Sequence, residues 1–330
     1  MIERTKVTLL ATLIAVFVAS RFSGHIGAYY YDIIITIGIN IILAVSLNLV
    51  NGYTGQFSLG HAGFMSVGAY TAAVFTTYCA GMLKVFSPLG AFVSVSVFFG
   101  IALLLAGIAA GVTGLIVGIP SLRLKGDYLA IVTLGFGEII RVIIQNVDAL
   151  GGSRGFSIDS QYTNLFWVYA TAALTVYVVL NLVHSTYGRG FLTVRDDEIA
   201  AEAMGINTTK YKVLAFALAA VFAGIAGGLY AHFKQYINPE GFNFMRSVDV
   251  VTMVILGGMG STFGVVVAAI VLTISLEVLR NVAHWTFLPH WLGGLLENRM
   301  IPYSLLLILL MLTRPQGLFG GITIGKRSKA

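Results

Sequence analysis

The feature that most constrains this chain is a series of continuous apolar runs, most of them about twenty residues long and nearly free of charge. An α-helix of that length spans the hydrocarbon core of a bilayer. The composition agrees, because 57% of the 330 residues are hydrophobic, only 10% are charged and the mean hydropathy is +0.88. An ordinary soluble domain carries far more charge than this. The runs therefore predict a membrane protein.

The same runs exclude two kinds of β-structure. An open sheet would leave unpaired backbone groups in lipid, and each of them costs several kcal/mol. A membrane β-barrel is built from segments of about ten residues in which apolar and polar side chains alternate, whereas these runs are continuous. The 38 glycines favour closely packed or interrupted helices. We therefore predict an all-α polytopic membrane protein in which residues 1–330 form a single transmembrane domain.

The apolar runs predict about ten transmembrane helices, within a range of about eight to eleven. The first run, Val7–Ser20, has 14 residues, a length that also suits the core of a signal peptide. Glu3 and the lack of a small-x-small cleavage site favour an uncleaved helix. The stretch 248–280 is either one long helix or two segments pinched at residues 257–261. The predicted spans are 7–21, 31–50, 58–80, 89–119, 127–147, 163–185, 212–233, 248–258, 262–280 and 300–313.

Basic residues set the predicted orientation. With an even number of spans, both termini and the loops after the fourth and sixth spans lie on one side of the membrane. That side carries twelve lysines and arginines, against seven on the other side, while Arg141 lies within a span. Because basic residues are enriched on the cytoplasmic side, we expect both termini and the charged segment 188–212 to be cytoplasmic. The polar loop 148–163 is then extracytoplasmic.

Two apolar regions, Asn51–Tyr70 and Gly257–Gly264, are interrupted by helix-breaking glycines. They lie in opposite halves of the chain, which we expect to be related. Paired glycine-interrupted segments of this kind point to a substrate pathway near the middle of the membrane. The alternative is that the glycines only allow tight helix crossings, and that His61 only satisfies a neighbouring backbone carbonyl. The candidate pathway residues are Gln56, Ser58, His61, Gly257, Gly258 and Ser261.

Two pairs of opposite charges lie within the predicted spans. Glu138 and Arg141 are three residues apart, as are Glu277 and Arg280, so each pair can meet on one helix face. We interpret them as structural ion pairs, because unpaired charges inside a bilayer are costly. The alternative is a proton relay, which would need a carboxylate at depth without a neighbouring cation.

The segment Gly188–Lys212 is unusual because it is charged and helix-like, with four basic and four acidic residues. We expect Thr193 or Asp196 to cap a helix of about eight to ten residues, and Gly205 to end it. We interpret this helix as a docking surface for a soluble partner. The alternative, a helix lying on lipid, is disfavoured because an anionic leaflet would repel its acids. Its candidate residues are Arg195, Asp196, Asp197, Glu198, Ala200, Ala201, Glu202 and Gly205.

These residues make the chain resemble a known family, the permease subunits of branched-chain amino acid ABC importers of the LivM type. The stretch RDDEIAAEAMG at 195–205 is similar to the cytoplasmic loop through which ABC permeases engage their ATPases, with the wider pattern Glu-Ala-Ala-x-x-x-Gly. Ala200, Ala201 and Gly205 match this pattern, whereas Ile199 occupies the glutamate position and Glu198 precedes it. The other similar stretches are LNLVNGYTGQFSLGHAGFMSVGAYTAA at 47–73, KGDYLAIVTLGFGEIIR at 125–141, GGMGSTFG at 257–264 and TRPQGLF at 313–319.

The resemblance implies a permease subunit that carries branched-chain amino acids inward across the bacterial inner membrane. It implies alternating access driven by ATP, which partner subunits bind. The expected partners are two ABC ATPase subunits, a second homologous permease in a heterodimer, an extracytoplasmic amino-acid-binding protein and membrane lipid, but no nucleic acid. We expect no catalytic residue, no metal site and no cofactor in this chain, which has a single cysteine, Cys79.

Three alternatives stay open at the level of sequence. Related members of the family carry urea or short amides with the same architecture. A self-powered, proton-coupled transporter is a second alternative, although it needs the lone carboxylate described above. A membrane-embedded enzyme is the third, although no convergent set of catalytic side chains stands out. The nearest match to a nucleotide-binding loop, at 320–327, has arginine where that loop needs serine or threonine.

Overall fold

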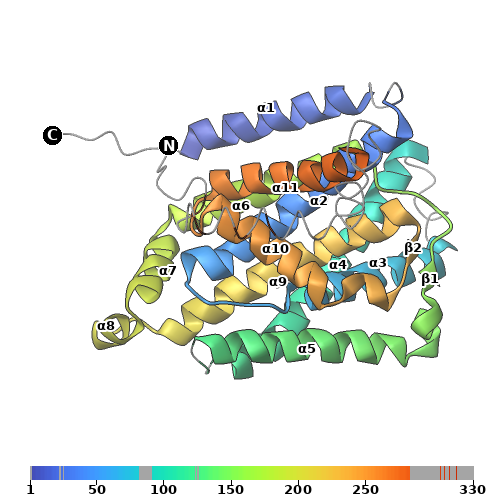
Figure 1. Cartoon of the computed structure of the whole chain (residues 1–330). Helices are drawn as coiled ribbons and strands as arrows, with labels where there is room; N and C mark the ends of the chain where they lie inside the picture. The colour runs from blue at the N-terminus through green and yellow to red at the C-terminus, as the bar shows by residue number, and fades with distance from the viewer. Residues whose placement is uncertain are drawn as a thin grey trace.

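The computed structural model describes residues 2–21, 24, 26–81, 91–122, 124, 126–282 and the single positions 305, 308, 312 and 317. Long helices make up most of these residues (Figure 1). They are α1 (Ile2–Arg21), α2 (Ala28–Asn48), α3 (His61–Tyr78), α4 (Ala91–Ser121), α5 (Asp127–Gln145), α6 (Leu165–Val183), α9 (Thr208–Lys234), α10 (Phe244–Gly257) and α11 (Thr262–Val282).

Short elements connect the long helices. Two strands form an antiparallel ribbon in which Phe156 lies opposite Ile237, so the loop after α5 is tied to the loop after α9. A π-helical segment, η2, continues α2 without a break. The short elements are η2 (Leu49–Tyr53), η5 (Asp148–Leu150), η6 (Gly152–Arg154), β1 (Phe156–Ser157), α7 (Thr186–Asp196), α8 (Glu198–Ala203), β2 (Tyr236–Ile237) and η7 (Pro239–Phe242).

The core of the bundle is built around the continuous helix of α2 and η2. In its most apolar 18-residue stretch, 83% of the residues are buried. α2 packs against α6, α9, α10 and α11. A second group, α3, α4 and α9, packs through small residues. A Cβ atom on Gly68 would overlap the backbone of Gly224, and one on Gly227 would overlap the carbonyl oxygen of Met65. Such backbone contact is how small residues join helices in membranes.

Among the described helices, five are long and apolar enough to cross a membrane: α2 with η2, α4, α5, α6 and α9. Four further helices, α1, α3, α10 and α11, lie at predicted spans. The prediction of an all-α polytopic membrane protein is therefore confirmed. The last predicted span, 300–313, lies outside the described residues apart from isolated positions.

The stretch 248–280 is two helices rather than one. α10 ends at Gly257 and α11 begins at Thr262. Between them, Gly258 has a φ of +94° and Gly260 a φ of +83°. Both angles lie in the left-handed region, which glycine adopts without steric cost and which interrupts an α-helix. Of the two predicted possibilities, the pinched one is correct.

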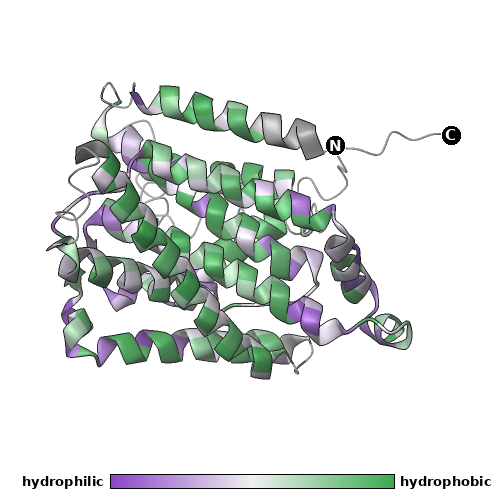
Figure 2. Cartoon of the chain, turned by 180° about the vertical axis from the view of Figure 1, so that it is seen from behind, coloured by the Kyte–Doolittle hydropathy of each residue, from purple (hydrophilic) through white to green (hydrophobic). Residues whose placement is uncertain are grey.

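The polar segments gather at opposite ends of the bundle (Figure 1). α1, α5 and α9 begin at the end where α7 and α8 lie, and the β1–β2 ribbon lies at the other end. This grouping agrees with the predicted separation of segment 188–212 from loop 148–163. Between the two ends, hydrophobic residues dominate the helices (Figure 2). Exposed apolar side chains there include Leu104, Ile116, Ile131 and Ile143.

Candidate functional site

A single residue, Asp197, separates α7 from α8 and caps the second helix. Its Oδ1 accepts hydrogen bonds from the backbone N–H groups of Ile199 (2.9 Å) and Ala200 (3.0 Å). A carboxylate at this position satisfies amides that lack a partner within the helix. The predicted cap at Thr193 or Asp196 is wrong, because both residues lie inside α7. The docking helix is correspondingly shorter than predicted, with six residues instead of eight to ten.

α8 ends at the glycine that the sequence indicates. Gly205 has a φ of +81°, in the left-handed region that favours glycine. Its N–H donates to the carbonyl of Glu202 (2.9 Å), and the N–H of Ile206 donates to that of Ala201 (3.0 Å). A Cβ atom on Gly205 would meet nothing within 4 Å. Backbone conformation, not crowding, therefore selects glycine here.

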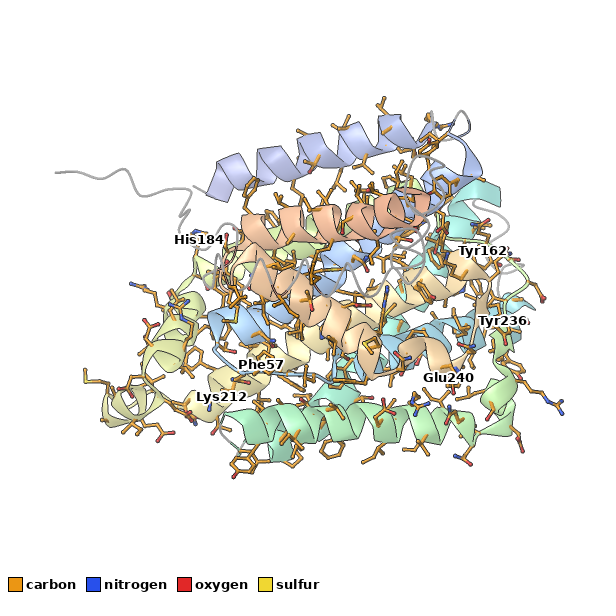
Figure 3. The ribbon with its side chains drawn as sticks, in the orientation of Figure 1. Phe57, Tyr162, His184, Lys212, Tyr236 and Glu240 are labelled. Atoms are coloured by element: carbon orange, nitrogen blue, oxygen red, sulfur yellow. The ribbon has the colours of Figure 1, made fainter. Side chains whose placement is uncertain are left out.

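Two acids of the segment fix α8 to the beginning of α9. The Glu198 Oε1 atom lies 2.6 Å from Nζ of Lys212, whose side chain is only 8% exposed. The Thr208 hydroxyl donates a hydrogen bond to Oε1 of Glu202 at 2.7 Å. Figure 3 shows Lys212 on α9, close to α8. α8 is therefore held against α9 at two points.

α8 also carries exposed apolar side chains. Ile199 is 74% exposed and Met204 is 81% exposed, whereas Ala201 is fully buried. Most of the other side chains of α7 and α8 that face solvent are polar. Apolar groups surrounded by polar ones are typical of a surface that docks another protein. Ala201 is part of the packing beneath this surface.

Arg195, in the last turn of α7, reaches from the charged segment into the bundle. Its Nε and Nη2 atoms donate to Oδ1 of Asp196 at 3.0 and 2.9 Å. Its Nη1 atom donates to the carbonyl oxygen of Gly52 at 3.5 Å. Gly52 belongs to η2, so the charged segment directly contacts the first glycine-interrupted region.

The first glycine-interrupted region is a buried π-helix followed by irregular backbone at 54–60. The Ser58 N–H donates to Oδ1 of Asn51 at 3.2 Å. His61 is a satisfied buried histidine, because its Nε2 lies 3.0 Å from Oγ of Ser46. Gln56 differs from both: it is 5% exposed, and no described residue hydrogen bonds its side-chain nitrogen or oxygen.

The second glycine-interrupted region lies directly against the first. The Gly260 N–H donates to Oδ1 of Asn48 at 2.9 Å. The Tyr53 hydroxyl lies 2.8 Å from that of Thr262. A Cβ atom on Gly52 would overlap both the Asn48 side chain and the Gly260 nitrogen. We name this contact of five residues the glycine junction.

The other candidates of the second region shape the turn between α10 and α11. A Cβ atom on Gly257 would lie 2.5 Å from the Cα atom of Val265. The Ser261 hydroxyl oxygen accepts a backbone N–H bond in the first turn of α11. Gly258 is in contact with Gly317, where a Cβ atom would lie 2.5 Å from the Gly258 Cα atom. All three therefore have packing or capping roles in this turn.

The structure contains the first of the two predicted ion pairs. The Arg141 Nε atom lies 2.7 Å from Oε2 of Glu138. The Arg141 Nη1 atom also lies 3.8 Å from Oε1 of Glu240, which Figure 3 shows opposite α5. Beside this pair is a small, partly open cleft, where α3, η7 and α10 approach α5. Its lining includes Glu138, Asn243 and Ser247 among the apolar Leu59, Leu134 and Phe244.

The second predicted ion pair stays a prediction. Glu277 accepts a hydrogen bond from the hydroxyl of Tyr29 at 3.0 Å. The side chain of Arg280 lies outside the described part of the structure. The contact with Tyr29 joins α11 to the first turn of α2.

A further buried polar cluster was missed by the sequence analysis. Asn40 donates to the hydroxyl of Thr273 at 2.9 Å and accepts a hydrogen bond from Arg246 at 3.2 Å. The Arg246 guanidinium also lies 5.8 Å from the centre of the Tyr230 ring. Arg246 lies outside the predicted span 248–258, but in the structure it belongs to the first turn of α10 and is half-buried. The available signal was Asn40, an amide in the middle of an apolar run.

Comparison with known proteins identifies the family. The family model described as a branched-chain amino acid transport system permease component matches residues 29–313. The high-affinity branched-chain amino acid permease protein LivM of Salmonella typhimurium is 36% identical over 94% of this chain and 74% of its own length. The probable LivM protein of Methanocaldococcus jannaschii is 26% identical over 87% of this chain and 92% of its own. The LivH permease protein of Salmonella typhimurium is 29% identical over 52% of each chain.

No solved structure matches this chain significantly. The family match covers the helices from α2 onward, including the glycine junction and α7–α8. The chain therefore belongs to the family of permease components of branched-chain amino acid transport systems.

Proposed function

We propose that this protein is the permease subunit of an ABC importer that carries branched-chain amino acids across the bacterial inner membrane. Two separate ATPase subunits bind ATP and power it, and an extracytoplasmic binding protein delivers the amino acid. A second, homologous permease completes the membrane part as a heterodimer, which the similarity to both LivM and LivH proteins supports. Both termini and α8 face the cytoplasm.

The observation that carries this proposal is the construction of α8. Ile199 and Met204 are exposed on a helix that the Glu198–Lys212 ion pair fixes to α9. Covering each apolar side chain with a partner stabilises the complex by about 2 kcal/mol. The exposed acids beside them, such as Asp197, oppose docking on an anionic leaflet. A cleft in an ATPase subunit is the partner that fits.

The glycine junction is the proposed moving part of the pathway. ATP binding draws the ATPase subunits together and displaces α8, and the bundle then opens to the other side. A bound partner shifts such an equilibrium only through contacts that differ between the two states. Gln56, buried without a hydrogen-bond partner in the described structure, is the side chain of this region best suited to contact a polar substrate group.

The test is uptake by the reconstituted transporter. The chain, the second permease and the ATPase subunits are placed in proteoliposomes with the binding protein and radiolabelled leucine. We expect ATP-dependent uptake only when the ATPase subunits are present. Uptake by the isolated chain under an imposed proton gradient would favour a self-powered transporter instead.

A variant pair tests the docking surface itself. Ile199→Asp places a charge on the exposed apolar surface of α8, so the ATPase subunits should no longer co-purify with the permease. Tyr236→Asp is the control, because Tyr236 is 50% exposed but lies at the opposite end of the bundle (Figure 3). It should retain the ATPase subunits. Equal retention by both variants would show that α8 is not the docking site.

The substrate class is tested by competition. LivM relatives are named for branched-chain amino acids, which supports leucine, isoleucine and valine as substrates. We expect these three to compete with labelled leucine, and urea or acetamide not to compete. Competition by urea or acetamide alone would move the protein to the amide-transporting members of the family.

A further inference from the structure

One side chain of the docking segment, that of Arg195, lies against both glycine-interrupted regions. Its Nη1 atom is 3.5 Å from the carbonyl oxygen of Gly52. A Cβ atom on Gly55 would lie 2.9 Å from the Arg195 Cγ atom, and one on Gly260 would lie 3.2 Å from Nη1. The aliphatic stem therefore packs on the first region, while the guanidinium lies between the first and the second.

The contact with Gly52 has a clear electrostatic basis. The last carbonyl groups of a helix lack partners within it and form the negative end of its dipole. Gly52 is near the end of the continuous helix formed by α2 and η2. A guanidinium at this end forms a charge-assisted hydrogen bond. Because 3.5 Å is longer than the usual range of about 2.7–3.2 Å, a small movement of α7 toward or away from Gly52 strengthens or breaks it.

A displacement of Gly52 passes directly into the second region. Asn48 holds the Gly260 N–H at 2.9 Å, and Tyr53 bonds Thr262 at 2.8 Å. Gly52 and Gly260 are packed so closely that neither backbone can move toward the other. Tightly packed groups transmit a displacement rather than absorb it. The beginning of α11 therefore follows Gly52.

The second connection of α8, to α9, has a different character. The Glu198–Lys212 pair is short, at 2.6 Å, and the Lys212 side chain is 8% exposed. A short ion pair that is largely shielded from water is costly to break, so it fixes α8 in place. The Arg195 contact is longer and partly exposed, with 37% of the side chain accessible. Lys212 is thus an anchor, and Arg195 is the adjustable contact.

We propose that Arg195 is a positioning residue that transmits movement of the docked α7–α8 unit to the glycine junction. It links the position of α8 to the geometry of both helix breaks. This inference rests on the proposed docking of an ATPase on α8. It assigns Arg195 to transmission and leaves docking itself to Ile199 and Met204.

The test measures movement at the junction directly. Cys79→Ala removes the single cysteine of the chain. Met259→Cys then places a thiol beside Gly260, at a position that is 55% exposed. In the reconstituted complex, the rate of maleimide labelling of the permease is compared without nucleotide and with ATP plus vanadate. The comparison is made with Arg195 intact and with Arg195→Met.

With Arg195 intact, nucleotide should change the labelling rate about tenfold, the size of a typical coupling between two sites. Arg195→Met should abolish this change while the ATPase subunits still co-purify and hydrolyse ATP. Arg195→Lys keeps the charge but not the planar fork, so it should recover the change only in part. Arg154→Met removes an exposed arginine at the opposite end and should leave the response unchanged.

Three results would overturn the inference. These are an undiminished nucleotide response in Arg195→Met, no response when Arg195 is intact, and loss of ATPase co-purification in Arg195→Met. The last result would place Arg195 in the docking surface. Failure of the docking proposal is recognised separately, because Ile199→Asp would then retain the ATPase subunits.

Discussion

The α7–α8 unit and the glycine junction are built in opposite ways. In α7–α8 several charged side chains form ion pairs, while two large apolar side chains face solvent. Glu198 forms a short ion pair with Lys212, while Ile199 and Met204 are 74% and 81% exposed. Glu198 thus already has a partner within the chain, whereas Ile199 and Met204 are not covered by it. The α7–α8 unit needs an apolar partner to be fully covered.

Around the glycine junction, apolar contacts are complete and polar contacts are not. The side-chain nitrogens of Asn48 and Asn51, and the whole amide of Gln56, are buried without a hydrogen-bond partner among the described residues. Buried amides without partners are unfavourable, because their desolvation is not compensated. This region therefore needs polar partners, from a substrate, from water or from a rearranged backbone.

The difference separates two tasks. A unit fixed by ion pairs stays rigid when a partner binds and moves it, so it can transmit that movement. In an interior whose buried amides lack partners, a backbone movement breaks few hydrogen bonds. Such a region can therefore change conformation at low cost. Arg195 is the side chain that joins the two, since it bonds Asp196 on the outside and Gly52 on the inside.

The largest expected effect comes from crowding the junction. In Gly52→Ala the new methyl group would overlap the Asn48 side chain and the Gly260 nitrogen. Overpacking of this kind costs about 3 kcal/mol. We expect a lower unfolding midpoint of the detergent-purified protein and loss of leucine uptake.

The control for this variant is Gly135→Ala on α5. A Cβ atom on Gly135 would meet nothing within 4 Å, and alanine favours helix more than glycine does. Its unfolding midpoint should therefore stay the same or rise. If Gly52→Ala is as stable as Gly135→Ala, the close contact between the two breaks is not part of the folded protein.

The next largest effect is expected when the ion pair between α8 and α9 is removed. Lys212→Met removes the ammonium group 2.6 Å from the Glu198 carboxylate and costs about 2 kcal/mol. We expect weaker co-purification of the ATPase subunits, because α8 is no longer fixed to α9. The double variant Lys212→Met with Glu198→Gln should recover part of the stability, since it also removes the negative charge at position 198. If Lys212→Met is as stable as the unaltered protein, the pair contributes nothing to stability.

A smaller effect is expected at the end of α8. Gly205→Val forces a β-branched residue into the left-handed region at a cost of about 1 kcal/mol. Asparagine tolerates that region, so Gly205→Asn should cost less. Because a Cβ atom here has open space, the permease should remain in the membrane in both cases. ATP hydrolysis should be uncoupled from uptake in the valine variant, and normal uptake in that variant would contradict a role for the α8 turn in coupling.

The positions of most spans follow from sequence because length and apolarity alone decide them. α2, α4, α6 and α9 match predicted spans to within a few residues at most of their ends. The glycine stop of α8 was also predictable, since a positive φ has a residue-specific cost. These features depend on local chemistry, which the sequence states directly.

Two parts of the site were not predictable from residue type or apolar pattern. Asp196 and Asp197 are equally good caps by residue type. Only the folded structure shows that Asp196 is occupied by Arg195, leaving Asp197 to cap α8. The π-helix η2 has the same apolar pattern as an α-helix. Its contact with Gly260 comes from the other half of the chain, so no local pattern reveals it.

The smallest expected effect has the opposite sign and tests the buried amides near the glycine junction. Gln56→Met keeps the length of the side chain but removes an amide that has no partner in the described structure. Removing an unpaired buried amide should stabilise the protein, by about 1 kcal/mol or less. Leucine uptake should nevertheless fall, because the group proposed to contact the substrate is gone.

The matched variant is Asn40→Leu, whose amide is fully bonded to Thr273 and Arg246. Its removal leaves a hydroxyl and a guanidinium without their partner, so the protein should be destabilised. The two variants should therefore shift the unfolding midpoint in opposite directions, although each replaces one buried amide by an apolar group. If both variants lower the unfolding midpoint, the Gln56 amide already has hydrogen-bond partners in the assembled protein. The contrast between the α7–α8 unit and the glycine junction would then no longer explain which of them moves.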